Sequence, residues 1–232
     1  MAPTRTLITG GSQGIGAAIV VAARAAGHEV VFTGRNQELI EGTAAETGAH
    51  GIVADVSRAE DNARTVEVCH EHMGGIDVLV NNAGFGYPAR IGEVDLDKMK
   101  ALFDTNVFGL VDLTNRVVPL MKEQGYGDIV NVASTSGIKG HPGGTAYSAS
   151  KWAVRGISQC WQAELRPHDI RVISICPSEV QTNWGGRTGR NDPNKLFAPD
   201  IADAILAALA ANRRALWPEI AVFATNPWGT TE

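Results

Sequence analysis

The stretch Thr9-Gly10-Gly11-Ser12-Gln13-Gly14-Ile15-Gly16 decides the fold, because it joins a β-rich run at residues 6–9 to a helical pattern at residues 15–26. Glycines let a backbone turn tightly and approach a pyrophosphate, which then binds free N–H groups at the N-terminus of the following helix. The spacing here is Gly10-x3-Gly14-x-Gly16. In a first strand–helix turn, it predicts a dinucleotide site rather than a plain turn. The residues of this site would be Gly10, Ser12, Gln13, Gly14, Ile15 and Gly16.

Short β-rich runs alternate with helical patterns along the rest of the chain. Further strands are predicted at residues 29–33, 51–54, 77–80, 128–132, 170–175 and 220–223. Helices are predicted at residues 37–47, 57–72 with Ser57 as cap, 96–124, 146–166 and 200–211. This alternation predicts an α/β fold of the Rossmann type, a doubly wound parallel sheet of about seven strands with helices on both faces. We expect one catalytic domain over residues 1–232, with a short substrate lid around residues 181–198.

Composition excludes several classes of function. The net charge is −5 and no run of Lys or Arg occurs, so a nucleic-acid partner is not expected. No stretch approaches 18 apolar residues, which argues against a membrane span. The histidines show no metal-ligand spacing, and no metal is expected. Three widely separated cysteines suit a reducing compartment, so a cytoplasmic location is expected.

A second motif carries the chemistry. Tyr147 and Lys151 are four residues apart in a predicted helix and therefore share one face. Ser134 ends the predicted strand before that helix, at the sheet edge where active groups of α/β proteins gather. A free tyrosine has a pKa of about 10, and proton transfer near neutral pH needs a lower value. The Lys151 ammonium, beside an oxidised nicotinamide, would favour the phenolate of Tyr147.

With these motifs in place, the chain resembles the short-chain dehydrogenase/reductase family in its single-domain form. Seven motifs occur in the family's order and cover nearly the whole chain. They are the turn from Thr9 to Gly16, Asp55-Val56, Asn81-Asn82-Ala83-Gly84, Asn106, Ser134, Tyr147 with Lys151, and the segment from Pro177 to Thr182. The resemblance implies hydride transfer between a nicotinamide cofactor and a small carbonyl compound or alcohol.

The resemblance also implies a role for each matching residue. Tyr147 would be the general acid in reduction and the base in oxidation, while Ser134 would hydrogen-bond the substrate oxygen. Lys151 would bind the nicotinamide ribose, and Asn106 would lie at a helix distortion and position a water between Lys151 and solvent. The other matching residues would bind the cofactor: Asp55 and Val56 at the adenine, Asn82, Ala83 and Gly84 at its ribose, and Pro177, Val180 and Thr182 at the nicotinamide.

The end of the second predicted strand favours NADP(H) over NAD(H). NAD-binding chains place a carboxylate there for the ribose 2′-hydroxyl, whereas a nearby Arg accommodates a 2′-phosphate. This chain has Gly34-Arg35-Asn36 at that point. Arg35 offers a planar fork of donors that suits a phosphate, and Ser12 and Asn36 would add neutral hydrogen bonds.

Two rival functions stay open. A 3-oxoacyl-thioester reductase would belong to the same family, although the chain has Gly125 and His168 where such reductases often carry basic residues. A protein that senses NADP(H) without catalysis should lack Tyr147 or Lys151, and both are present.

A homotetramer, with a dimer as the fallback, is the expected assembly. The predicted helix is apolar on two sides from Val107 to Val118, and one domain covers only one of them. The family resemblance supports the tetramer.

Overall fold

The computed structural model describes residues 4–182 and 191–227. Seven parallel strands form one sheet in the order β3-β2-β1-β4-β5-β6-β9. These strands are β1 (Arg5–Ile8), β2 (Glu29–Gly34), β3 (His50–Val53), β4 (Val78–Asn81), β5 (Gly127–Val132), β6 (Ile170–Pro177) and β9 (Glu219–Val222). The α-helices are α1 (Gly14–Ala25), α2 (Gln37–Thr47), α3 (Ala59–Met73), α4 (Leu96–Phe103), α5 (Leu110–Gln124), α6 (Thr145–Leu165) and α7 (Ala198–Ala210). The predicted fold class is confirmed.

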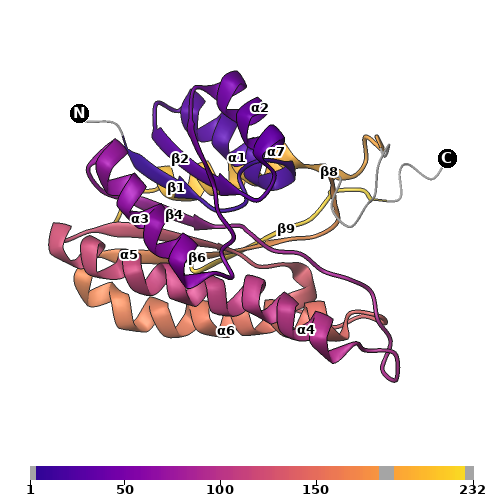
Figure 1. Cartoon of the computed structure of the whole chain (residues 1–232). Helices are drawn as coiled ribbons and strands as arrows, with labels where there is room; N and C mark the ends of the chain where they lie inside the picture. The colour runs from indigo at the N-terminus through magenta and orange to yellow at the C-terminus, as the bar shows by residue number, and fades with distance from the viewer. Residues whose placement is uncertain (1–3, 183–190, 228–232) are drawn as a thin grey trace.

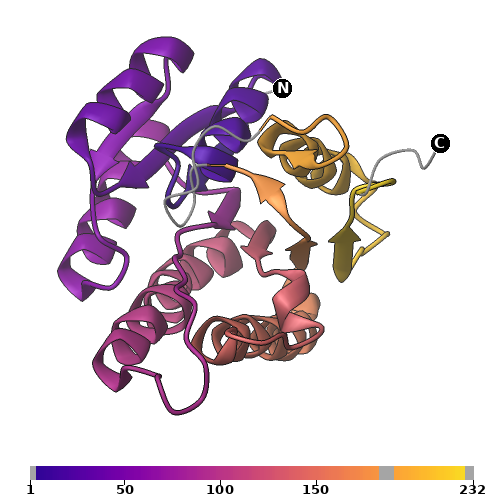
Figure 2. The same cartoon turned by 90° about the vertical axis from the view of Figure 1, so that its right-hand side faces the viewer.

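Helices cover both faces of the sheet because successive strand residues point to opposite sides (Figure 1 and Figure 2). In β1, Leu7 packs into one buried cluster and Ile8 into another. The cluster of Ile8 contains Ile19 of α1 and Ile201 of α7, and that of Leu7 contains Val117 of α5. Strands buried on both faces explain the unbroken apolar runs of the sequence.

The strand positions agree with the predictions to within about one residue at most ends, but three local expectations were wrong. Ser57 does not cap α3; Arg58 is the N-cap residue, and the Ser57 hydroxyl donates to Asp55 Oδ1 at 2.7 Å. No strand was expected near residue 181 or residue 196, yet β7 (Val180–Gln181) pairs in parallel with β8 (Leu196–Phe197). The last helix starts at Ala198 rather than at residue 200.

The long helix expected at residues 96–124 is interrupted by a π-helical segment. This segment, η1 (Asp104–Gly109), lies between α4 and α5 and contains the buried Asn106. A π-helical turn holds more residues than an α-turn, so it rotates the side chains that follow. Two 3₁₀ turns complete the elements, η2 (Thr135–Gly137) before α6 and η3 (Arg166–His168) after it.

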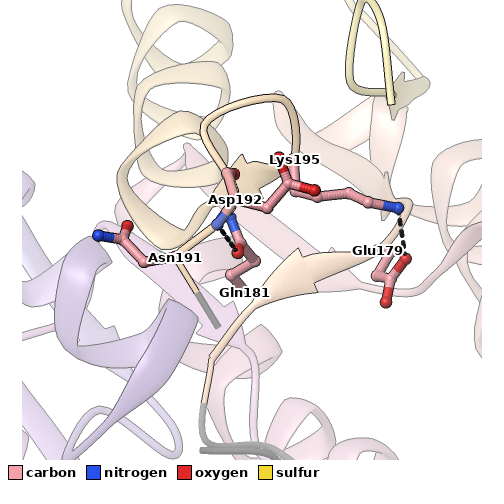
Figure 3. A pocket seen from close by; sticks show the side chains of 5 residues that line it. All are labelled: Glu179, Gln181, Asn191, Asp192 and Lys195. Carbon is pink, nitrogen blue, oxygen red and sulfur yellow. Dashed lines mark hydrogen bonds and ion pairs between the residues drawn. The ribbon is translucent and has the colours of Figure 1, made fainter. Parts of the chain in front are cut away.

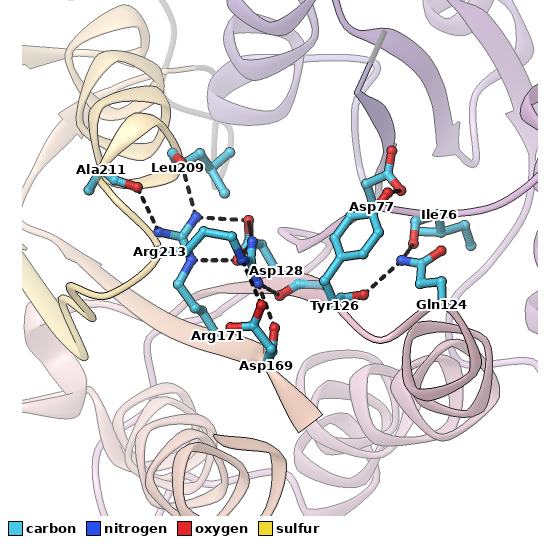
Figure 4. A network of polar contacts seen from close by, with 11 residues as sticks. Ile76, Asp77, Gln124, Tyr126, Asp128, Asp169, Arg171, Leu209, Ala211 and Arg213 are labelled. Carbon is cyan, nitrogen blue, oxygen red and sulfur yellow. Dashed lines mark hydrogen bonds and ion pairs between the residues drawn. The ribbon is translucent and has the colours of Figure 1, made fainter. Parts of the chain in front are cut away.

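A polar network fastens the strands at their amino ends (Figure 4). Asp77, just before β4, accepts hydrogen bonds from the Arg5 backbone at 2.8 Å and from the Tyr126 hydroxyl at 2.7 Å. Asp128 of β5 accepts a bidentate pair from Arg171 of β6 at 2.6 and 2.9 Å. Burial raises the pKa of the Asp77 carboxyl. Its hydrogen bonds to Arg5 and Tyr126 lower the pKa by more than burial raises it, so the pKa lies below the ordinary value.

This lowered pKa predicts how Asp77→Asn will behave. The ionised carboxylate contributes stability above its unfolded pKa of about 3.9, and this is lost as the pH falls through the lower folded pKa. At pH 7 the variant should lose about 2 kcal/mol of unfolding free energy, the value of a hydrogen bond to a charged group. The loss should shrink below about pH 4, as measured by urea unfolding.

Asp97→Asn is the matched control, because Asp97 lies exposed on α4 and makes only a surface ion pair with Lys100. Its urea midpoint should stay near that of the wild type. Equal deficits for Asp77→Asn at pH 3 and pH 7 would contradict this reading of the network.

Candidate active site and cofactor pocket

The glycine-rich turn has a conformation and a close packing that only glycines allow. Gly10 and Gly14 have φ angles of +65° and +56°, in the left-handed region that favours glycine. A Cβ at Gly16 would overlap the carbonyl oxygen of Gly10. Helix α1 begins at Gly14, and the Gln13 side chain makes no capping hydrogen bond. The first N–H groups of α1 therefore face the turn and suit an anion.

Thr9 fixes this turn against the end of β4, a role that the sequence did not reveal. The Thr9 Oγ1 accepts hydrogen bonds from the backbone N–H groups of Asn82 and Ala83, both at 3.0 Å. In return, Asn82 Nδ2 donates to the carbonyls of Thr9 and Gly10 at 2.9 and 3.1 Å. Asn82 thus holds the glycine turn in place as well as lining the pocket.

At the end of β2, Gly34 packs closely against Ser12 and Ile40. A Cβ placed on Gly34 would lie 2.7 Å from Ser12 Oγ and 3.1 Å from Ile40 Cγ1. The neighbouring Arg35 is exposed, and its guanidinium lies 3.9 Å from the carboxylate of Asp55 at the end of β3. Arg35 is therefore loosely held and able to turn toward a ligand.

The structure places Asn36 outside the pocket. Its Oδ1 accepts a hydrogen bond from the Leu39 backbone at 3.0 Å and so caps α2. Asp55, by contrast, lines the pocket together with Val56.

Ser134, Tyr147 and Lys151 come together at the carboxyl end of β5. The Tyr147 side chain hydrogen-bonds to the Ser134 side chain, and Lys151 Nζ lies 5.7 Å from the centre of the Tyr147 ring. Lys151 Nζ donates to the carbonyl of Val132 at 2.7 Å, which fixes the buried ammonium beneath the pocket. Ser134 Oγ accepts from the Ser136 backbone at 3.1 Å. The hydroxyl hydrogen of Ser134 is thus free to reach Tyr147 or a substrate oxygen.

Asn106 lies at the helix distortion that the resemblance implies. Its Oδ1 accepts from the Phe85 backbone N–H at 3.0 Å, and its Nδ2 donates to the Phe85 carbonyl at 2.9 Å and to Ser150 Oγ at 3.1 Å. Asn106 does not line the pocket itself. Its amide fixes the loop at Phe85 and ties that loop to α6.

Burial governs the ionisation of the two central groups. It raises the pKa of the Tyr147 phenol, and the hydrogen bond to Ser134 opposes this rise. Burial also lowers the pKa of Lys151 to about 8. The side chains around Tyr147 do not by themselves lower its pKa, so the expected depression depends on charge brought by a cofactor.

These features line one cavity of about 1000 Å³, at the upper end of the range for cofactor and small-molecule sites. Every predicted site residue except Asn36 and Asn106 lines it. At the expected nicotinamide end are Pro177, Val180 and Thr182, with Thr182 Cβ positioned 3.5 Å from where a Cβ of Gly14 would be. The cavity wall also includes residues that the sequence analysis did not name, namely Phe85, Tyr87, Pro88, Ser136, His141 and Pro142.

The expected lid is described only at its two ends, since residues 183–190 lie outside the described part of the chain. Gln181 Nε2 donates to the Asp192 carbonyl at 2.8 Å, and the Asp192 N–H donates to Gln181 Oε1 at 2.7 Å (Figure 3). Lys195 pairs with Glu179 at 3.0 Å. These contacts surround a second cavity of about 500 Å³ and hold the two lid ends together.

Comparison with known proteins identifies the family. The family model described as short chain dehydrogenase matches residues 4–192. The chain belongs to the short-chain dehydrogenase family. An uncharacterized oxidoreductase of Staphylococcus saprophyticus is 37% identical to it over 209 residues, which cover 88% of this chain and 89% of the relative. This short-chain dehydrogenase is thus a member of an oxidoreductase family.

Two solved structures support the same assignment. An alcohol dehydrogenase from the archaeon Thermococcus sibiricus, complexed with 5-hydroxy-NADP, matches with a TM-score of 0.87 and 25% identity and covers 99% of both chains. A 3-ketoacyl-(acyl-carrier-protein) reductase from Brucella melitensis, complexed with NADH, matches with a TM-score of 0.89 and 27% identity. It covers 97% of this chain and 98% of the reductase. The two neighbours differ in cofactor, so neither decides the cofactor here.

Within residues 4–182 and 191–227, no helix combines the length and apolarity that a membrane span requires. The same residues contain no group of three or more His, Cys, Asp or Glu side chains placed to hold a metal ion.

Proposed function

We propose that this short-chain dehydrogenase reduces a ketone or aldehyde with NADPH, or oxidises a secondary alcohol with NADP⁺, using Tyr147 as general acid and base. The observation that carries the proposal is the contact between the Tyr147 and Ser134 side chains, with Lys151 Nζ 5.7 Å from the Tyr147 ring. All three side chains line the large cavity at the carboxyl edge of the sheet. This is where α/β folds bind ligands.

The cavity fits a dinucleotide. The turn of Gly10, Gly14 and Gly16 and the N-terminus of α1 would hold the pyrophosphate, because the first N–H groups of α1 have no side-chain cap and all three glycines line the cavity. Asp55 and Val56 would flank the adenine, and Tyr147 and Lys151 would bind the nicotinamide ribose. Ala83 and Gly84 would line the adenine-ribose side, with Pro177, Val180 and Thr182 at the nicotinamide.

Two observations at the end of β2 favour NADP(H). Position 34 lacks the carboxylate that would accept hydrogen bonds from the ribose of NAD(H), and the Cβ of any side chain there would lie 2.7 Å from Ser12 Oγ, so that Ser12 would have to shift. Arg35 stands next to this point with its guanidinium exposed, and a guanidinium pairs well with a phosphate. Asn36 is not part of this proposed phosphate site, because its Oδ1 already caps α2.

The proposed chemistry divides between cofactor and protein. A bound nicotinamide supplies a hydride in reduction and accepts one in oxidation. In reduction, Tyr147 donates its phenolic proton to the carbonyl oxygen while Ser134 donates a hydrogen bond to the same oxygen. The Lys151 ammonium stabilises the phenolate that remains, and a proton from solvent restores the phenol. Asn106 would contribute by fixing the Phe85 loop and, as the family resemblance implies, by positioning a water near Lys151.

A panel of small ketones, aldehydes and 3-oxoacyl thioesters, followed by loss of NADPH absorbance, tests the activity. The thioesters test the rival function as a 3-oxoacyl-thioester reductase, since one structural neighbour is a 3-ketoacyl-(acyl-carrier-protein) reductase. Turnover confined to thioesters would select that rival, and no turnover with any compound would favour a sensor.

Tyr147→Phe should lower kcat by about 10²- to 10⁴-fold, the usual value of a general acid. The ring still packs and Lys151 still reaches the ribose, so the affinity for NADPH, measured by fluorescence titration, should fall by at most about tenfold, the value of one neutral hydrogen bond. Tyr126→Phe is the matched control, because Tyr126 lies at the opposite edge of the sheet, bonded to Asp77. A Tyr147→Phe enzyme that kept more than half of the wild-type kcat would remove Tyr147 from the proposed role.

Arg35→Leu should lower kcat/KM for NADPH by roughly 10- to 150-fold, which corresponds to the loss of one hydrogen bond to a charged group. The value for NADH should change little, because NADH has no 2′-phosphate. Arg35→Lys keeps the charge and loses the planar fork of donors. Its kcat/KM for NADPH should lie between the values of the wild type and Arg35→Leu. Equal kcat/KM values for NADPH and NADH in the wild type would show that Arg35 does not read the phosphate.

The proposed assembly is a homotetramer in the cytoplasm. Val107 and Val117 are buried, while Phe108 and Trp152 of the same helical layer are 60% and 51% exposed. Exposed aromatic side chains on packed helices suit an interface. Light scattering should give about four times the chain mass of 24.6 kDa, or twice that mass for a dimer. A mass near 24.6 kDa at micromolar concentration would contradict both.

A further inference from the structure

Two polar side chains that the proposed chemistry does not use lie beside the catalytic residues. Ser136 and His141 line the same cavity as Ser134 and Tyr147. They come from η2 and from the loop that joins η2 to α6. The Ser136 backbone N–H donates to Ser134 Oγ at 3.1 Å, so the pair is attached directly to the residue that would hold the substrate oxygen.

The surroundings of His141 fix which of its nitrogens accepts a hydrogen bond. His141 Nδ1 lies 3.2 Å from the carbonyl oxygen of Pro142, which can only accept. In the neutral ring, Nδ1 therefore carries the hydrogen and Nε2 is the acceptor. The Ser136 hydroxyl lies 3.3 Å from Nε2 and is the donor of that long hydrogen bond.

The backbone holds the imidazole in this position. A Cβ on Gly144 would lie 2.7 Å from His141 Cε1, so the ring packs closely on a residue that has no side chain. The Gly144 N–H donates to the His141 carbonyl at 3.0 Å, and the Ala89 N–H donates to the Gly143 carbonyl at 2.9 Å. The His141 loop is thus tied to the loop of Tyr87 and Pro88, which also lines the cavity.

The substrate end of the cavity is otherwise neutral among the described residues. Its wall there includes Phe85, Tyr87, Pro88 and Pro142 with Ser136 and His141. The charged residues of the lining are Arg35 and Asp55 at the adenine end, Lys151 beneath Tyr147, and Glu179, which pairs with Lys195. A neutral substrate with one extra polar group fits this wall better than a carboxylate or a phosphate.

We propose that Ser136 and His141 form a second substrate anchor that binds a hydroxyl on the carbon next to the reacting carbonyl, which makes α-hydroxy ketones and vicinal diols the favoured substrates. The inference rests on the proposed function. A substrate hydroxyl donates to His141 Nε2 and accepts from the Ser136 hydroxyl, and so replaces their long mutual bond with two shorter ones. A plain ketone leaves the pair bonded to itself, so it loses this gain without leaving either group unpaired.

The test compares acetophenone with 2-hydroxyacetophenone, two neutral ketones that differ by the hydroxyl alone. With NADPH, the wild type should prefer the hydroxy ketone by about tenfold in kcat/KM, the value of 1.4 kcal/mol. His141→Phe and Ser136→Ala should each reduce this preference, which is the ratio of the two kcat/KM values within one variant, to about threefold or less.

Two control variants separate the anchor from general effects on the fold. His141→Gln keeps an acceptor in the cavity and should retain part of the preference. His70→Phe changes an exposed histidine of α3 and should retain all of it. A wild type without preference, or a His141→Phe variant with the full preference, would overturn the anchor.

Calorimetry distinguishes failure of the anchor from failure of the proposed function. A protein that reduced no carbonyl compound of the panel would contradict the proposed function. The anchor would then be decided by binding of 1-phenylethane-1,2-diol, which should be tighter than that of 1-phenylethanol to the wild type and equal to it in His141→Phe. Equal binding of the two alcohols to the wild type would overturn the anchor independently of turnover.

Discussion

The parallel pairing of β1, β4, β5 and β6 is the constraint on which the site depends. Ile8 pairs with Val80, and Val132 pairs with Ile175, so these strands end at the same edge of the sheet. Thr9 consequently meets the end of β4 across more than seventy residues of chain. A shift of one residue in any pair would turn the side chains of that strand to the other face. The register therefore determines the two buried clusters and the site together.

A layer of buried polar side chains connects this register to the reacting groups. Asn81 Nδ2 of β4 donates to Asn131 Oδ1 of β5 at 2.9 Å and to Thr114 Oγ1 of α5 at 3.1 Å. Asn131 Nδ2 in turn donates to Ser158 Oγ of α6 at 2.9 Å. Buried polar groups are costly without partners, so these bonds favour one arrangement of α6 on the sheet. Because α6 carries Tyr147 and β5 leads to Ser134, the layer fixes their separation.

Sequence alone predicted the features that local pattern controls. The apolar runs and the Gly-rich turn led to the sheet, and the spacing of Tyr147 and Lys151 placed both on one face of α6. Ser57 was misplaced as a cap because the choice between it and Arg58 depends on where Asp55 holds the chain. The two residues of β7 have no pattern of their own, since they pair with β8 about fifteen residues later.

Roles set by tertiary contact lay beyond the pattern. Thr9 accepts hydrogen bonds from the end of β4 only because the register of β1 and β4 brings the two together. Asn36 was expected to bind the cofactor, but its side chain caps α2 instead. The position of Asn106 at a helix distortion came from the family resemblance, because a π-helical segment has no distinct periodicity in so short a stretch. Ser136 and His141 were missed because loop residues acquire a common partner only when the loop is folded.

Transfer of deuterium from cofactor to product tests directly whether this edge of the sheet is a hydride-transfer site. The enzyme would be incubated with NADPH that is deuterated at C4 of the nicotinamide and with the carbonyl compound that it reduces fastest, and the alcohol would be examined by mass spectrometry. We expect one deuterium on the carbinol carbon, delivered from one face of the nicotinamide ring, and a rate of transfer lower by about 10²- to 10⁴-fold in Tyr147→Phe under the same conditions. Two results would contradict hydride transfer at this site. One is an alcohol without deuterium whichever of the two C4 hydrogens of NADPH is replaced by deuterium. The other is no oxidation of NADPH with any carbonyl compound offered.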